Sequence, residues 1–131
     1  MGVKDVWPEL TPSNELTPLG ILRKQASLLF RKTNGLLEGE VVTDGKGGVF
    51  LHRFNVVAPA LGYFKHELFS IGHGLNSYPL TGTNSKGEQT AIKSEDELYG
   101  WIAAQIIDQK PALERLLNES MTDSMRAELV G

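Results

Sequence analysis

Three histidines, His52, His66 and His73, fall within a short part of this 131-residue chain. Imidazole is a common general base near neutral pH and a common ligand of transition metals. The whole chain contains no cysteine, which excludes thiol nucleophiles and zinc–thiolate centres. The chemistry to consider is therefore that of imidazole, and it depends on how the fold positions the three rings.

Segments 49–58 and 63–71 are rich in β-branched and aromatic residues and predict two antiparallel strands. Their alternation puts His52 and His66 on one face as diagonal neighbours, roughly 7–8 Å apart at their Cα atoms. That distance is wide for a shared metal ion, and His73 has the opposite strand parity. We therefore expect no metal site and no other cofactor. His52 and His66 are the only weak candidates for metal ligands.

Catalysis would depend on His73, which stands between Gly72 and Gly74. Glycine lets the backbone approach a ligand closely, and loops often carry function. Glu67 and Arg53 are the polar residues that would join His73 in a hydrolase- or nuclease-like site. A general base also needs an orienting partner and a substrate within reach, and the sequence identifies neither. We therefore expect a protein that is not an enzyme and keep the small hydrolase or nuclease as an alternative.

Helix signals stand on both sides of the strand region. Thr17–Pro18 is typical of an N-cap followed by the first helical position, and Asn34–Gly35 is a typical stop. Ser94 and Glu97 match a capping box at the start of a second helix, and Pro111 begins a third.

Three parts of the chain follow from these signals. Residues 1–16 are expected to form an extended or flexible arm, 17–118 a single domain, and 119–131 a flexible or marginally helical tail. We expect Trp7 to dock on its own domain. Docking on a neighbouring subunit is the alternative.

Short connections between the strand-like segments predict an antiparallel meander. Asp44–Gly45 predicts the turn of the first hairpin. The fold class is α+β, with an N-terminal helix and two C-terminal helices packed on a four- to five-stranded sheet, in the order α-β-β-β-β-(β)-α-α. The segments are 36–43, 49–58, 63–71, 77–83 and 88–93.

Charge is unevenly distributed along the chain. The first helix carries four basic residues and no acidic one, whereas 94–123 holds seven acidic residues against two basic ones. We expect these regions to be complementary neighbours on the sheet, with an anionic-ligand site on the first helix as the alternative. The net charge of −3 does not favour a nucleic acid or an anionic membrane as partner.

Apolar residues occur at both parities of the strands, which predicts a sheet with two apolar faces. Because only three helices are available to cover them, we expect the second face to be buried in a homodimer. The residues predicted for that interface are Val49, Leu51, Val57, Phe69 and Ile71.

These observations favour a non-catalytic binding or interaction module that self-associates through a sheet face and can engage a protein partner. The lack of cysteine fits a cytoplasmic protein. A second alternative to the interaction module is a protein that binds a small apolar ligand. Its cavity would be lined by Phe50, Phe54, Phe64 or Trp101.

Overall fold

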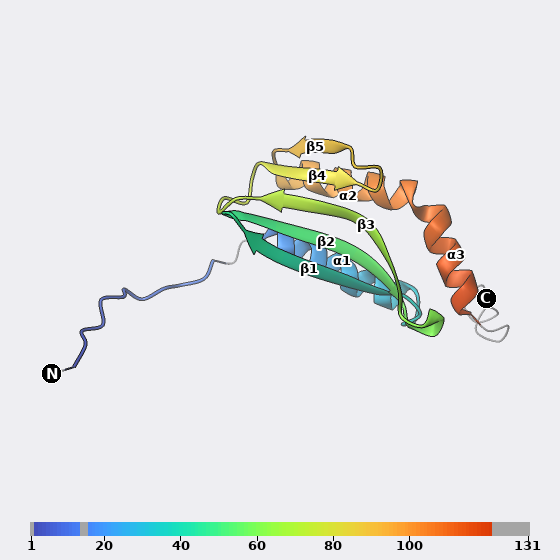
Figure 1. Cartoon of the computed structure of the whole chain (residues 1–131), viewed down its shortest axis with the longest axis horizontal. Coiled ribbons are helices and arrows are strands. Elements are labelled where there is room, and N and C mark those ends of the chain that lie inside the picture. Colours follow the sequence, from blue (N-terminus) through green and yellow to red (C-terminus); the bar gives the residue numbers. More distant parts are fainter. Residues whose placement is uncertain (1, 14–15, 122–131) are drawn as a thin grey trace.

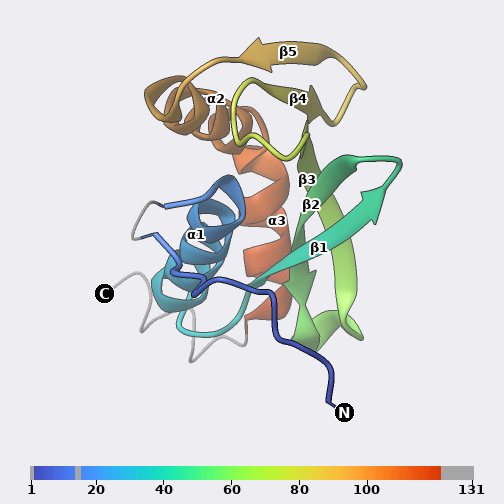
Figure 2. The same ribbon diagram turned by 90° about the vertical axis from the view of Figure 1, so that its left-hand side faces the viewer.

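The computed structural model describes residues 2–13 and 16–121 of the chain. Within these residues one helix precedes five strands and two helices follow them, which confirms the predicted α+β class (Figure 1). The strands form one antiparallel sheet in the order β1-β2-β3-β4-β5, and Figure 2 shows the helices on one side of it. The elements are α1 (Pro18–Lys32), β1 (Glu38–Lys46), β2 (Val49–Ala58), the 3₁₀ helix η1 (Pro59–Leu61), β3 (Phe64–His73), β4 (Leu80–Asn84), β5 (Gln89–Ile92), α2 (Glu95–Asp108) and α3 (Lys110–Ser120).

The helices begin where their capping residues stand. The Thr17 hydroxyl accepts a hydrogen bond from the Gly20 amide (3.0 Å), which satisfies a donor that α1 leaves free. At the start of α2, the Ser94 hydroxyl accepts from the Glu97 amide, and the Glu97 carboxylate accepts from the Lys93 amide. No helix among the described residues is long and apolar enough to cross a membrane.

The first hairpin turns later than its sequence predicts. Gly47 and Gly48 form the two-residue loop, with φ angles of 63° and 78°, while Lys46 pairs with Val49. Positive φ at both loop positions is what a type I′ turn requires, and two glycines adopt it without steric cost. The turn predicted at 44–45 is wrong, because both of those residues continue β1 as paired residues.

A β-bulge changes the register between β2 and β3. Phe54 pairs with Phe69 but the next residue of β2, Asn55, pairs with Glu67, which leaves Leu68 as an extra residue in β3. Because of that extra residue, Leu68, Phe69 and Ile71 are all buried in the same core, at 2% exposure or less. The prediction that Phe69 and Ile71 belong to a second sheet face left for a homodimer is wrong, because both are part of the core.

The core lies between the sheet and the helices. Phe54 and Phe69 stack at 5.4 Å between ring centroids, and the Trp101 ring of α2 meets Phe69 edge-on at 5.2 Å. Aromatic pairs in such geometries add about 0.5–1.5 kcal/mol beyond the burial of their area. Each helix contributes aliphatic side chains to this cluster or packs them against it; they include Ile21, Leu22, Leu98, Ile102, Leu113 and Leu116.

The outer face of the sheet is largely polar. Arg53 lies 3.4 Å from Asp44 and 3.7 Å from Glu67, and Lys65 lies 3.0 Å from Glu40 across the strands. Each exposed pair stabilises the fold by at most about 1 kcal/mol. Their presence nevertheless means that this half of the sheet needs no apolar cover, unlike the two-faced apolar sheet predicted above.

Two glycines permit close packing of helices on the sheet. A Cβ atom on Gly39 of β1 would lie 2.5 Å from the Cα and Cβ atoms of Ala26 in α1. A Cβ atom on Gly82 of β4 would lie 2.6 Å from the Trp101 ring. The contact at Gly39 is the more constrained, because the neighbouring atom belongs to the helix backbone and cannot rotate away.

The N-terminal arm extends away from the domain in Figure 1, as an arm without helix or strand in residues 2–13. Trp7 is 75% exposed, so the prediction that it docks on its own domain is wrong. The predicted tail 119–131 lies mostly outside the described residues, and its first two residues belong to α3.

We predict that Gly39→Ala lowers the free energy of unfolding by about 1–3 kcal/mol, because the added methyl group overpacks the contact with α1. Gly45→Ala is the matched control in the same strand, since its Cβ would meet Phe50 at an ordinary 3.6 Å. Chemical denaturation of both variants measures the difference. Equal stabilities for the two variants would contradict the close packing described at Gly39.

Candidate functional site

His52 and His73 meet on the helix side of the sheet. The bulge reverses the parity of the end of β3, so His73 shares a face with His52 instead of opposing it. Their Nε2 atoms are 2.8 Å apart. The Nδ1 atom of His52 is 2.8 Å from the Thr43 hydroxyl of β1, and the Nδ1 atom of His73 is 2.7 Å from the Gly74 carbonyl oxygen. Two predicted site residues thus form one hydrogen-bonded chain.

The acceptor at the end of this hydrogen-bonded series determines which ring nitrogens of the two histidines carry protons. The Gly74 carbonyl can only accept, so the Nδ1–H group of His73 donates to it. When both rings are neutral, His52 then donates from Nε2 to His73, and the Thr43 hydroxyl donates to Nδ1 of His52. If His73 takes up a proton, it donates from Nε2, and His52 donates from Nδ1 to Thr43. Two charged rings would put two N–H groups against each other, so the pair accommodates at most one added proton.

His52 is the inner member of the pair and is only 2% exposed. Burial lowers the pKa of His52 below its usual value, and the nearby His73 and Arg23 lower it further. His73 is half-buried, and its ring also lies 5.5 Å from that of Phe50. The pair is thus a partly enclosed hydrogen-bonding unit in which the outer ring meets solvent.

His66 does not join this pair. It pairs with Val56, four residues along β2 from His52, and its Nε2–H group donates to the Gln109 side chain at 3.1 Å. The predicted diagonal contact between His52 and His66 is wrong because the turn after β2 lies one residue later than expected, over 59–63, so that Val56 and not Phe54 faces His66. The described residues contain no group of three or more side chains arranged to hold a metal ion.

Arg53 and Glu67 lie on the outer face of the sheet, away from His73. Arg53 pairs with Ser70, and its guanidinium contacts Glu67 across the strands. The structure therefore does not bring together the three residues predicted for a hydrolase- or nuclease-like site.

The five residues predicted for a sheet-face interface are also separated. Val49 and Leu51 lie on the outer face, where Val49 is half-exposed, and Val57 has the same parity but is buried. Phe69 and Ile71 belong to the core beneath the helices. They do not form one continuous surface of the monomer.

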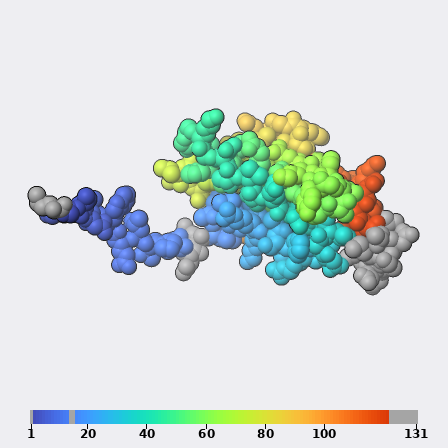
Figure 3. Space-filling view, turned by 60° about the horizontal axis from the view of Figure 1, so that its bottom comes forward, coloured from blue at the N-terminus to red at the C-terminus, as the bar shows by residue number. Residues whose placement is uncertain are grey.

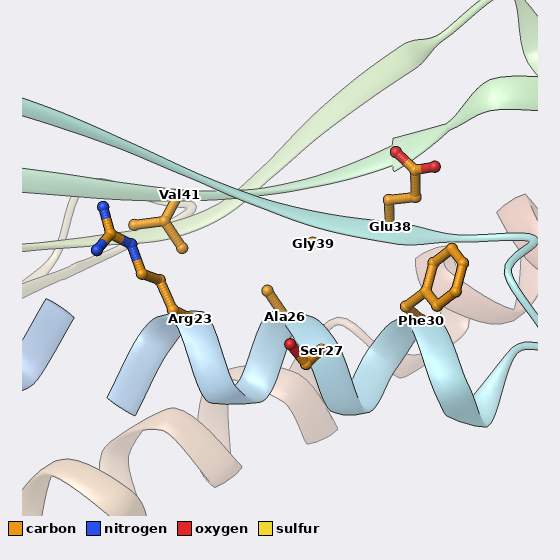
Figure 4. Close-up of a pocket in the computed structure, with 7 residues that line it drawn as sticks. All are labelled: Arg23, Ala26, Ser27, Phe30, Glu38, Gly39 and Val41. Atoms are coloured by element: carbon orange, nitrogen blue, oxygen red, sulfur yellow. The ribbon is translucent and has the colours of Figure 1, made fainter. Parts of the chain in front are cut away.

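A groove between α1 and β1 is a feature that the sequence did not indicate (Figure 4). It encloses about 430 Å³ and lies beside the free edge of β1, the first strand of the sheet. Its aromatic surface comes from Phe30, which is 48% exposed. The sequence feature that could have indicated this groove is the pair of small residues Gly39 and Ala26, which face each other in the structure. Its lining residues are Arg23, Ala26, Ser27, Phe30, Glu38, Gly39 and Val41.

Arg23 gives one end of this groove a positive charge. Figure 4 shows its guanidinium beside Val41, and the same charge contributes to the lowered pKa of His52. Among the described residues, the ion pairs join β1, β2 and β3, and none joins α1 to α2 or α3. The predicted charge pairing between the first and the C-terminal helices is therefore not seen there, and the basic side chains of α1 face the groove or solvent.

A scan against models of known protein families finds no match, and searches of curated proteins and of solved structures find no similar chain. The function of the chain therefore has to be inferred from its own geometry.

We predict that the protein loses stability as the pH falls below about 6.5, the ordinary pKa of histidine. Below that value the imidazole of His52 binds a proton in the unfolded chain, whereas its burial lowers its pKa in the folded protein and opposes that protonation. The slope from His52 is at most about 1.4 kcal/mol per pH unit, since one proton is exchanged. Denaturation at several pH values measures it.

His52→Gln should reduce this acid sensitivity, because it removes the imidazole whose pKa is lowered by burial. His66→Gln removes an imidazole elsewhere in the sheet and is the matched control, with both variants measured between about pH 7.5 and 5.5. If His52→Gln retained the wild-type slope, His52 would not be its origin.

Proposed function

We propose that the protein is a non-catalytic interaction module whose groove between α1 and β1 binds an extended polypeptide segment with acidic and apolar side chains. The observation that carries this proposal is the coincidence of a free strand edge with an aromatic and basic helix surface. The strand edge supplies hydrogen-bonding groups, and the helix supplies the side-chain selectivity.

The free edge of β1 favours an extended ligand. Because β1 pairs only with β2, half of its backbone N–H and C=O groups point away from the sheet. An added strand satisfies such groups and gains affinity from main-chain hydrogen bonds, as in the known peptide-binding modules that work by strand addition. The nine residues of β1 contain no proline to block the edge.

The charge at the Arg23 end of the groove favours a ligand with a carboxylate there. Two of the three carboxylates of β1 are paired on the outer face, Glu40 with Lys65 and Asp44 with Arg53. The third, Glu38, lines the groove toward the end opposite Arg23 (Figure 4). A ligand with a carboxylate near Arg23 and apolar side chains near Phe30 would gain from this cation.

Other functions receive less support. A hydrolase or nuclease centred on His73 has neither Glu67 nor Arg53 within its reach, because both lie on the opposite face. A cavity for an apolar ligand exists beneath α1, lined by residues such as Phe54, Val56 and Leu113, but it encloses only about 180 Å³. Ligand pockets usually measure about 300–1,000 Å³.

Fluorescence anisotropy can test the proposal with a labelled peptide of alternating valine and glutamate as the probe. We expect the wild-type protein to bind it, and Arg23→Glu to weaken binding by about tenfold, since a groove cation becomes an anion. Arg115→Glu makes the same charge change on α3 and is the matched control, with little effect expected. Equal affinities for these two variants would show that the peptide does not bind in the groove.

A further inference from the structure

The arm carries apolar side chains that find no partner on its own domain. Val3, Val6, Trp7 and Leu10 are between 72% and 101% exposed. The arm lies clear of the body of the molecule in Figure 3, where it projects beyond α1. Large apolar side chains that gather in an exposed segment mark a surface for interaction more often than chance exposure does.

Two prolines prepare the arm for binding. Pro8 and Pro12 fix their own φ angles and disfavour helical conformations for the residues before them. A segment that is already extended when free loses less conformational entropy when it binds. The arm therefore has the backbone shape that a strand edge accepts.

The side-chain order of the arm matches the groove. In an extended segment Asp5, Trp7 and Glu9 point to one side, so an indole is flanked by two carboxylates. The groove presents Phe30 along the same helix surface as Arg23. These two residues are seven positions apart on α1, or roughly 10 Å, and each carboxylate residue of the arm lies roughly 7 Å from Trp7. The long side chain of Arg23 can therefore meet one of these carboxylates when Trp7 contacts Phe30.

Pro8 is compatible with pairing in this register. If the odd-numbered residues of the arm form the backbone hydrogen bonds to β1, the even-numbered Pro8 faces away from the sheet. Its lack of an N–H group then costs no hydrogen bond with β1. The twelve residues 2–13 can span at most roughly 40 Å, which exceeds the roughly 30 Å of β1. One arm is thus long enough to cover the whole edge.

We propose that the segment bound in the groove is the arm of a second copy of this chain, and that two copies exchange arms in a symmetric dimer. This inference rests on the proposed function, because it names the occupant of the same groove. In such a dimer the residues of the arm on one protomer contact α1 and β1 of the other, and the reverse contact follows by symmetry. Trp7 packs against Phe30 of the other copy, and one of the two flanking carboxylates, Asp5 or Glu9, lies toward its Arg23.

Light scattering coupled to size-exclusion chromatography tests the exchange with the full chain at about 100 µM. We expect a dimer for the wild type. Trp7→Ser and Arg23→Glu should each raise the dissociation constant by about tenfold or more, one by weakening the arm and the other the groove. Leu75→Ser removes an equally exposed apolar side chain in the β3–β4 connection and is the matched control, with no change expected.

Mixing the two variants gives the decisive measurement. A Trp7→Ser copy keeps an intact groove and an Arg23→Glu copy keeps an intact arm, so the mixture contains one intact arm–groove contact per heterodimer. We expect the mixture to dimerise more strongly than either variant alone. No gain on mixing, or a monomeric wild type, would overturn the exchange.

The two proposals fail separately in these experiments when peptide binding is measured on Trp7→Ser as well as on the wild type, because a weakened arm leaves the groove free for the peptide. A monomeric wild type that still binds the valine–glutamate peptide in an Arg23-dependent way overturns only the arm exchange. Loss of peptide binding together with dimerisation that ignores Arg23→Glu overturns both proposals.

Discussion

The register of β3 changes by one residue at Leu68, and the core of the protein depends on that change. Without the bulge, strict alternation would turn either Leu68 or Phe69 and Ile71 toward solvent. With it, all three are buried beneath the helices, and Phe69 provides the ring on which Phe54 and Trp101 pack. The same one-residue shift brings His73 to the face of His52. The core and the histidine pair therefore share one cause.

Because the sheet buries its apolar residues mainly on the helix side, the arm and the α1–β1 edge are left as surfaces for interaction. The outer face is occupied by cross-strand ion pairs of Arg53 and Lys65, and the exposed apolar groups of the described residues include four on the arm and Phe30 at the α1–β1 edge. Gly39 contributes to that edge, because its lack of a side chain lets Ala26 of α1 approach the strand. Close packing of helix and edge strand thus sets the shape of the groove.

The histidine pair has a structural role in this arrangement. Its hydrogen bonds run from Thr43 on β1, through His52 on β2, to His73 at the end of β3, so it joins three strands. A carbonyl at its end fixes the ring tautomers, and the short distance between the rings limits the charge. The charge of Arg23, which also lines the groove, contributes to the lowered pKa of His52.

The sequence by itself determined the element order, the helix starts at Thr17 and Ser94 and the meander, because capping and short connections are local properties. The turn at Gly47–Gly48 was also within local reach, since two glycines meet the φ requirement better than Asp44–Gly45. Only the tertiary structure decided which residues meet across strands, because a bulge has no reliable local signal and one extra residue reverses every later side chain. The histidine pair and the groove depend on such non-local contacts, so alternation alone could not reveal them.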